Sequence, residues 1–229
     1  MTQSRRRYPI LILLLFGSSF LCGLSAQNKL DLHDKRVLIL GDSITQRGTY
    51  VSFISYFLQK RNPDLDYDII SLGLGSETAA GTSEADHPFP RPCIHSRLDH
   101  ALEQTKPDIV FACYGMNDGI YHPFGMDRFQ AYQFGIESLV AKVHASNAEV
   151  VLLTPPPFDA DAKNSLAPPN ATDFSYKAPF AQYNDVLRTY GKWIMISRLS
   201  AARKIDLNTP MLEYNRQRRK IDPQFHLAN

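Results

Sequence analysis

Short apolar runs alternate with longer amphipathic segments along most of the chain. The apolar runs are rich in β-branched residues and lie at 36–40, 67–72, 108–114 and 149–153. Strands that are buried on both faces of a parallel sheet have this nearly continuous apolarity, because helices cover the sheet on each side. We therefore expect four parallel strands, with a candidate fifth strand at 204–207.

The segments between these runs carry apolar residues at helical spacing. Helices are predicted at 50–60, 94–105 and 128–145, with a last helix that includes 180–193. This βαβαβ rhythm predicts an α/β fold in which a mainly parallel sheet lies between layers of helices.

Ligands bind such sheets at the carboxyl ends of the strands, so the turns that follow the strands carry the most information. Polar or glycine-rich turns follow all four, at 41–45, 73–78, 115–118 and 154–157. We expect them to converge on one rim. Two long loops with little periodicity, at 83–92 and 155–179, are expected to lie over that rim and to shape substrate choice.

The first segment has the pattern of a secretory signal. Three arginines, Arg5 to Arg7, precede an apolar run that continues weakly to Leu24 and is followed by Ser25 and Ala26. A membrane anchor is the alternative, but glycine and serine interrupt the run, which is shorter than the roughly 20 residues that span a bilayer. We predict a signal peptide at 1–26 and a secreted or periplasmic domain at 27–229, without a stable membrane span.

Composition and charge narrow the function classes. The chain has 229 residues, 44% of them hydrophobic, which suits one domain. It has 25 basic and 23 acidic residues, and loss of the three leading arginines leaves these nearly balanced, so no attraction to nucleic acid is expected. A late basic cluster is interpreted as the solvated face of a helix; it comprises Arg216, Arg218, Arg219 and Lys220.

Two cysteines remain after the predicted cleavage, Cys93 and Cys113, which is too few for a disulfide scaffold. A bond between them is possible, but no pattern supports it. No metal-ligand spacing is present, and nothing in the sequence indicates an oligomeric state.

Two of the turns contain residue types suited to ester hydrolysis. Ser43 directly follows the first strand, which would hold its hydroxyl at the rim as a nucleophile; alternatively, Asp42, Ser43 or Thr45 only caps the next helix. Asn117 follows the third strand and could donate to the oxyanion of a tetrahedral intermediate, while Gly115 permits close backbone approach. The alternative is an ordinary turn residue. Ser43 and Asn117 together indicate ester hydrolysis more specifically than either residue alone.

The same turns resemble motifs of the SGNH, or GDSL-like, hydrolases. GDSIT at 41–45 resembles block I, GMND at 115–118 resembles block III, and the resemblance covers roughly residues 36–229. It implies a three-layer α/β/α flavodoxin-like fold and a serine esterase mechanism without a cofactor. It assigns the nucleophile to Ser43 and the oxyanion hole to the amide of Ser43, a block II amide and Asn117. The G-x-S-x-G motif of α/β-hydrolases is absent.

Block II departs from the family pattern. When Gly73 and Thr78 are matched to it, Ser76 stands where the glycine is usual and Ser71 where an asparagine is usual. The block II donor is a backbone N–H, which Ser76 can supply. A backbone geometry that requires glycine would, however, be strained at a serine.

Block V, the Asp-x-x-His that supplies the base and its orienting carboxylate, does not occur after block III. The nearest pair is Asp222 and His226, one residue too widely spaced. In relatives, a segment similar to Asp-Pro-x-Phe-x-Leu-Ala precedes block V, so the resemblance implies that residues 221–229 approach it and that the chain is C-terminally truncated. Otherwise His226, oriented by Asp222, or a different histidine, His87 or His122, would act as base.

The supporting residues are expected to be Asp42, Gly115, Asp118 and Asp222, with Asp118 and Glu77 bracing the turns. The leading prediction is a secreted ester hydrolase that acts on acyl or acetyl esters through an acyl-enzyme. Predicted secretion and the range of substrates of the family that the chain resembles make an acetylated polysaccharide one candidate substrate. Several aromatic residues near the rim could stack on sugars or could equally pack in the core or a loop; they are Phe89, Tyr114, Tyr121 and Phe124. The alternative is a catalytically incomplete domain that binds a ligand without turnover. A nucleotide site lacks its P-loop or dinucleotide motif.

Overall fold

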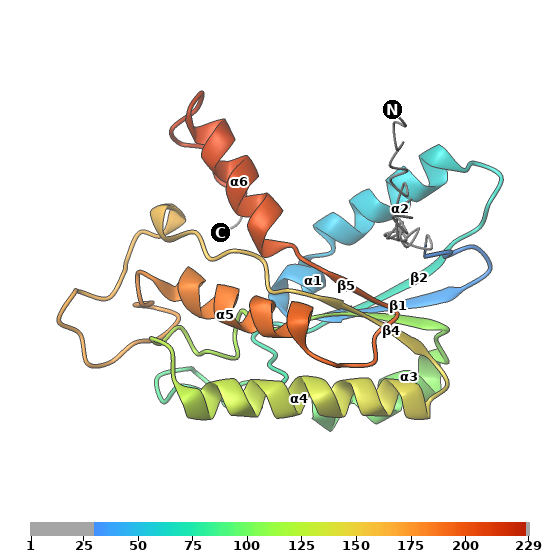
Figure 1. The fold of residues 1–229 in the computed structure, drawn as a ribbon, viewed down its shortest axis with the longest axis horizontal. Coiled ribbons are helices and arrows are strands. Elements are labelled where there is room, and N and C mark those ends of the chain that lie inside the picture. Colours follow the sequence, from blue (N-terminus) through green and yellow to red (C-terminus); the bar gives the residue numbers. More distant parts are fainter. Residues whose placement is uncertain (1–29, 228–229) are drawn as a thin grey trace, which may run out of the picture. The chain divides into compact units, whose positions relative to one another are not determined.

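A five-stranded, wholly parallel sheet organises the fold (Figure 1). The computed structural model describes residues 30–227, and every element belongs to the compact unit that begins at Asp31. The strands are β1 (Arg36–Gly41), β2 (Asp68–Gly73), β3 (Ile109–Cys113), β4 (Glu149–Leu153) and β5 (Arg203–Ile205). The α-helices are α1 (Ser43–Arg47), α2 (Thr49–Arg61), α3 (Leu98–Thr105), α4 (Met126–Ala145), α5 (Tyr183–Ile196) and α6 (Asn208–Arg219), and the 3-10 helices are η1 (Ile94–Ser96) and η2 (Ala160–Ala162). The predicted signal peptide at 1–26 lies outside the described residues.

The strand order is β2-β1-β3-β4-β5, the order of flavodoxin-like sheets. β1 is hydrogen-bonded to β2 on one side and to β3 on the other, with Leu38 paired to Ile70 and to Val110. The direction of the connections therefore reverses at β1, and a crevice opens beyond the carboxyl ends of β1 and β3. This is where the turns containing Ser43 and Asn117 begin.

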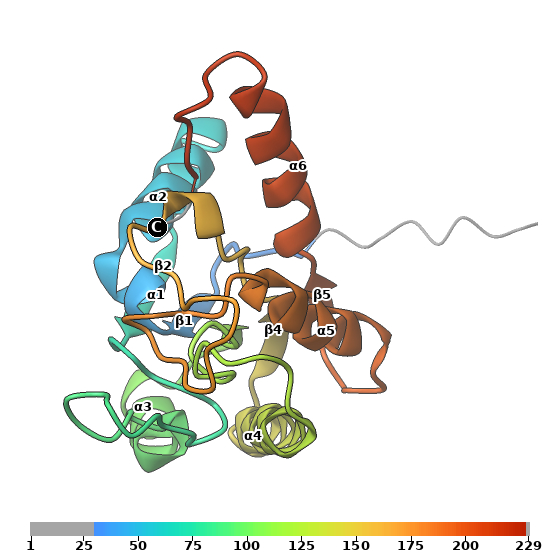
Figure 2. The same ribbon diagram turned by 90° about the vertical axis from the view of Figure 1, so that its left-hand side faces the viewer.

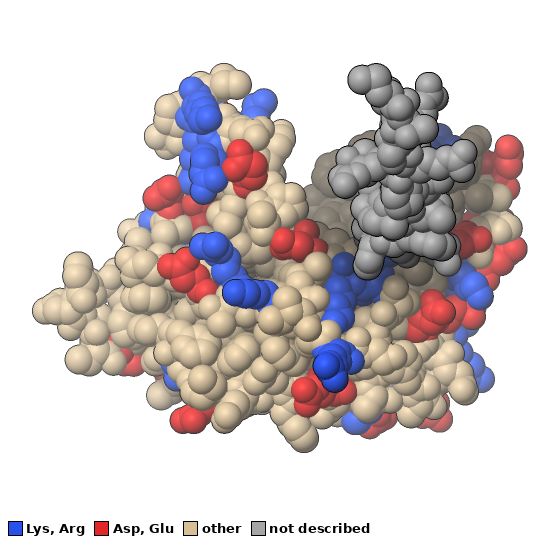
Figure 3. Space-filling view, in the orientation of Figure 1, with Lys and Arg blue, Asp and Glu red and all other residues tan. Residues whose placement is uncertain are grey.

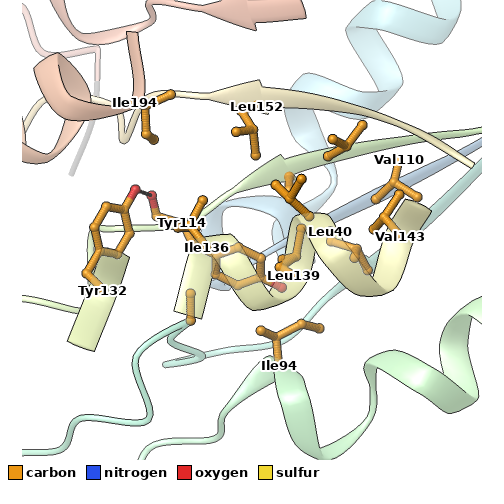
Figure 4. Close-up of a cluster of buried hydrophobic side chains, with 14 of the residues drawn as sticks. Leu40, Ile94, Val110, Tyr114, Tyr132, Ile136, Leu139, Val143, Leu152 and Ile194 are labelled. Carbon is orange, nitrogen blue, oxygen red and sulfur yellow. Dashed lines mark hydrogen bonds between the residues drawn. The ribbon is translucent and has the colours of Figure 1, made fainter. Parts of the chain in front are cut away.

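Helices cover both faces of the sheet, which confirms the predicted layered α/β fold. Figure 2 shows α3 and α4 on one side of the sheet and α2 and α6 on the other. The larger apolar core lies between the sheet and α3, α4 and α5, and Figure 4 shows part of it, including Tyr132, whose hydroxyl donates to the carbonyl of Tyr114 at 3.2 Å. A smaller cluster of Val37, Ile39 and Val51 lies under α2. Alternate side chains of β1 thus enter opposite cores.

The predicted elements are present with shifted ends. The helix expected over 94–105 is divided at Arg97, which leaves helical geometry while its guanidinium donates to the carbonyl of Leu72 at 2.8 Å. The fifth strand begins one residue earlier than expected and is shorter. The last helix, predicted to include 180–193, begins three residues later than expected, at Tyr183, and continues to Ile196.

Gly73 allows α1 to lie directly against the end of β2. A Cβ atom at this position would lie 2.1 Å from the backbone nitrogen of Gln46 and 2.5 Å from the carbonyl carbon of Thr45. Any side chain here would displace α1, whose first residue is Ser43.

Charged side chains of both signs share the surface seen in Figure 3, and basic ones gather along α6. Two of the four basic residues of the late cluster are paired with acids: Arg216 with Glu213 at 2.8 Å, and Arg219 with Asp159 and Asp161. Within residues 30–227, no helix has the length and apolarity needed to cross a membrane.

Candidate active site

Ser43 is the first residue of α1, two residues after the end of β1. The Asp42 carboxylate caps this helix and accepts from the amide of Ile44 at 3.0 Å, so capping and an exposed serine occur together. Burial of Asp42 raises the pKa of its carboxyl to about 6, against the opposing effect of the Ile44 amide. The Asp42 carboxylate accepts from the Ile44 amide and not from Ser43. The Ser43 hydroxyl therefore remains at the rim with no side-chain hydrogen bond to another described residue.

Asn117 is held in place after β3 by two hydrogen bonds. Its Nδ2 donates to the carbonyl of Glu77 at 3.1 Å, and its Oδ1 accepts from the hydroxyl of Tyr121 at 3.2 Å. Asn117 is 4% exposed, and its Nδ2 has a second N–H to offer. Gly115 has a φ of +128°, and a Cβ there would lie 3.0 Å from the ring of Pro155, so this turn requires glycine.

Ser76 has a φ of +63°, in the left-handed region that favours glycine. The strain expected from a serine at the block II glycine position is therefore present. Its amide, like that of Ser43, has no hydrogen-bond acceptor within residues 30–227. Both N–H groups are thus available to a ligand.

Ser43, Ser76 and Asn117 line one cavity of about 320 Å³, although they come from three different strand ends. The remaining lining comes from the two long loops and the turn after β3; it comprises His87, Pro88, Phe89, Arg91, Tyr121 and Tyr176. A larger hollow of about 490 Å³ lies between α5 and the start of α6 and contains none of the predicted catalytic or oxyanion residues. The chemistry therefore points to the smaller cavity.

The carboxylates after the strands brace the turns around this cavity. Asp118 Oδ1 accepts from the amides of Ala79 and Ala80, both at 2.8 Å, and burial raises the pKa of Asp118 to about 7. Glu77 accepts twice from Arg97, at 2.6 Å each, and once from the Tyr114 hydroxyl at 2.7 Å. Asp118 and Glu77 thereby connect the block II and block III turns to their surroundings.

The sequence profile of the GDSL-like Lipase/Acylhydrolase family matches residues 39–228, which is most of the chain. The chain belongs to this family. None of the curated proteins matches this chain significantly in sequence.

Two solved structures share its fold, and a third shows similarity to the chain. A gut microbial diltiazem-metabolizing enzyme matches over 88% of this chain and 43% of its own, with a TM-score of 0.63 and 22% identity. An acetyl xylan esterase matches over 82% of this chain and 84% of its own, with a TM-score of 0.55 and 19% identity. An acetylxylan esterase from Geobacillus stearothermophilus, in a mutant form, matches over 70% and 69%, with a TM-score of 0.49 and 19% identity. This chain spans less than half the length of the first of these proteins.

The C-terminal pair expected to complete the GDSL-like site lies elsewhere in the structure. His226 Nδ1 is 3.4 Å from Asp159 Oδ2 and 2.7 Å from Arg219 Nη2, and His226 is not among the residues that line the cavity. Asp222 accepts from the amide of Gln224 at 3.1 Å, in a local turn. The contacts of these two residues give no support to the role of His226 as base or of Asp222 as its orienting group, and both assignments remain predictions.

The other two histidines considered from the sequence differ in position. His87 lines the cavity, whereas His122 packs edge-on against Phe174 and is not part of the lining. Burial lowers the pKa of His122, and the charge of Arg128 lowers it further. Of His87, His122 and His226, only His87 lines the same cavity as Ser43.

Several residues in the cavity lining or bound to it could not have been found from the sequence. Glu84 and Arg91 form a buried ion pair within a polar loop, and Tyr176 comes from a loop almost a hundred residues later. No periodicity or motif connects them. Of the aromatic residues named above, Phe89 and Tyr121 line the cavity, while Tyr114 is 1% exposed and lies in the core.

Cys93 and Cys113 are both free, and burial raises the pKa of the Cys113 thiol, which keeps it protonated. No group of three or more candidate metal ligands occurs within the described part of the chain.

Proposed function

We propose that this chain is a serine esterase in which Ser43 forms an acyl-enzyme. The observation that supports the proposal is that Ser43, Ser76 and Asn117, from three strand ends, line one cavity. Membership of the GDSL-like family supports acyl ester hydrolysis as the general activity.

In the proposed reaction, Ser43 Oγ attacks the acyl carbonyl while a histidine accepts its proton. The amides of Ser43 and Ser76 and the Asn117 Nδ2 group donate to the oxyanion. The histidine then gives its proton to the departing alkoxide, so that the alcohol leaves and the acyl group stays on Ser43. Water attacks this ester in the same way, which releases the carboxylic acid and regenerates the free serine.

We further propose a short acyl group on a carbohydrate as the substrate. A volume of about 320 Å³ lies at the lower end of the roughly 300 to 1,000 Å³ typical of ligand pockets. Phe89 and Tyr176 are 52% and 39% exposed at this cavity, so their rings are available for stacking on a sugar. One protein of the same fold is an acetyl xylan esterase.

The test is hydrolysis of p-nitrophenyl acetate by the wild-type chain, Ser43→Ala and Ser52→Ala. Ser52 is an exposed serine on α2 whose hydroxyl bonds to the carbonyl of Gly48, so its substitution is a matched control. Turnover is expected in the wild type and in Ser52→Ala, and only background in Ser43→Ala. Equal rates in all three would refute Ser43 as nucleophile. p-Nitrophenyl octanoate should be a poorer substrate than the acetate, and acetylated xylo-oligosaccharides should release acetate.

The identity of the base is settled by the same assay with His226→Ala and with the chain extended by whatever the gene encodes after Asn229. Loss of turnover in His226→Ala would assign the base to His226. Turnover confined to the extended chain would place the base beyond Asn229.

The second candidate function is ligand binding without turnover. It is favoured by one observation, that no histidine within residues 30–227 is hydrogen-bonded to the Ser43 hydroxyl. Binding of an acetylated oligosaccharide with no acetate released by either form of the chain would support it.

We also propose that the protein is exported, because Arg5 to Arg7 and the apolar run that follows have the pattern of a secretory signal. N-terminal sequencing of the protein from an extracytoplasmic fraction should find a start near Gln27. An intact N-terminus in the cytoplasmic fraction alone would contradict this.

A further inference from the structure

Ser76 adopts a backbone conformation that is unfavourable for any residue with a side chain. Its φ of +63° places Cβ close to its own backbone, a cost that glycine does not have. Such residues persist where the surrounding contacts determine the conformation, and they cluster at functional sites. In this structure, other residues bind both the side chain and the carbonyl oxygen of Ser76.

The side chain of Ser76 is bound by His87. His87 Nδ1 lies 2.5 Å from the carbonyl oxygen of Phe89, which can only accept, so Nδ1 carries the proton. The other ring nitrogen, Nε2, is then an acceptor in the neutral imidazole, and the Ser76 hydroxyl donates to it at 3.1 Å. The imidazole therefore fixes the direction of the Ser76 side chain.

His87 itself is held by aromatic contacts from both long loops. Its ring packs edge-on against Phe89 with centroids 4.7 Å apart and lies 5.2 Å from the ring of Tyr176. The amide of Tyr176 in turn donates to the carboxylate of Glu84 at 3.4 Å. The two loops thus hold the imidazole against the block II turn.

Arg91 contacts the backbone of the same residue. Its Nη1 donates to the carbonyl oxygen of Ser76 at 3.4 Å, a long contact that the positive charge strengthens. Two further hydrogen bonds of 2.6 Å each join Arg91 to Glu84. The guanidinium also lies 5.6 Å from the ring centre of Tyr121, whose hydroxyl binds Asn117. Arg91 therefore contacts Ser76 directly and also contacts Tyr121, the residue that binds Asn117.

We infer that His87 and Arg91 are positioning residues that hold Ser76 in its left-handed conformation and so orient its amide toward the reacting acyl group. This inference rests on the proposed function, in which that amide is an oxyanion donor. It explains how a serine can occupy the position where the family usually has glycine, because the side chain that creates the strain also provides the hydroxyl that His87 binds.

The experiment measures kcat and KM for p-nitrophenyl acetate in His87→Ala and His87→Gln, each made with Ser76 and with Ser76→Gly. His100→Ala is the matched control, because His100 is an exposed histidine on α3. His87→Ala should lower kcat by about 10- to 100-fold, less than the roughly 10²- to 10³-fold loss when an oxyanion donor is removed. KM should stay within about 2-fold, since an interaction that acts in the transition state changes kcat.

Two comparisons separate positioning from other roles. Glutamine can present an acceptor to the Ser76 hydroxyl but cannot act as a general base, so His87→Gln should recover most of the lost kcat. In Ser76→Gly, where φ of +63° needs no support, His87→Ala should lower kcat by less than about 3-fold.

The inference is overturned if His87→Ala turns over like the wild type, or if its loss of kcat is the same in the Ser76→Gly background as in the chain that keeps Ser76. It is also overturned if His87→Gln is as inactive as His87→Ala, which would identify His87 as the base instead. If the wild type has no turnover that depends on Ser43, the proposed function fails and the inference with it. The Ser43→Ala assay distinguishes that outcome from the others, because it is read before any His87 variant.

Discussion

The ion pair of Glu84 and Arg91 allows a stability prediction with a magnitude. The two side chains are 3% and 2% exposed and are joined by two hydrogen bonds of 2.6 Å. Burial alone would raise the pKa of Glu84, but the hydrogen bonds and charge of Arg91 outweigh it and lower the pKa. Glu84→Gln leaves the guanidinium buried without its counter-charge, which costs about 3 to 5 kcal/mol in comparable pairs. For a domain of this size, that corresponds to a fall in Tm of roughly 6 to 20 °C.

The double variant Glu84→Leu/Arg91→Met should recover most of this loss, because removing both charges removes the desolvation cost along with the attraction. It still loses the contacts to the Tyr176 amide and the Ser76 carbonyl, so we expect it to remain about 1 to 2 kcal/mol less stable than the wild type.

Urea unfolding followed by the fluorescence of Trp193 measures both effects, since this single tryptophan packs on Tyr132 in the core. Glu213→Gln is the matched control: it removes a carboxylate from an exposed ion pair with Arg216, and no measurable change is expected. A folded-state pKa below 4.5 also means that the stabilisation by Glu84 is present above that pH and lost as the pH falls through the lowered pKa. A loss below about 1 kcal/mol in Glu84→Gln, or a double variant no more stable than this single one, would falsify the account.

Three further predictions concern the turns around the cavity. The pKa of about 7 for Asp118 means that the folded protein keeps this proton where the unfolded chain has lost it. The free energy of unfolding should therefore fall as the pH rises from about 4 to about 7. In Asp118→Asn this pH dependence should be absent, which urea unfolding at pH 5 and pH 8 measures. Gly73→Ala should cost at least about 1 to 3 kcal/mol and also lower turnover, because the new methyl group would push Gln46 and α1 away; unchanged thermal unfolding would contradict this. Tyr121→Phe, which removes the hydrogen bond to Asn117, should lower kcat several-fold while changing stability by no more than about 1.5 kcal/mol, and kinetics alongside thermal unfolding test both parts.

The sequence predicted the sheet and the rim because both leave strong local patterns. Central parallel strands such as β1 and β3 are apolar on both faces, so their residues form continuous runs. Ser43 and Asn117 could be placed because they directly follow such strands. Ser76 could be placed only through its resemblance to block II, and its strain followed from the type of residue.

The contacts that complete the cavity could not be predicted, because they join side chains of irregular loops. The pairing of Glu84 with Arg91 and of His87 with Ser76 depends on how two long loops fold back over the sheet. Loop conformation has no periodicity in the sequence. The break at Arg97 was missed for a similar reason: it depends on a tertiary contact with Leu72 rather than on helix propensity.

β1 and β3 are neighbours in the sheet but are far apart in the sequence. This arrangement determines when, during synthesis of the chain, the cavity lined by Ser43 and Asn117 can first form. Arg36, at the start of β1, binds the side chain of Asp108, 72 residues later, just before β3. Connections of this length form slowly, because the loop must close before its contacts contribute. A nascent chain that has released β1, α2 and β2 from the ribosome already carries Ser43, but it has no Asn117 beside it. The cavity that Ser43 and Asn117 line is therefore assembled in a late step of folding, after the third strand has emerged and docked beside the first.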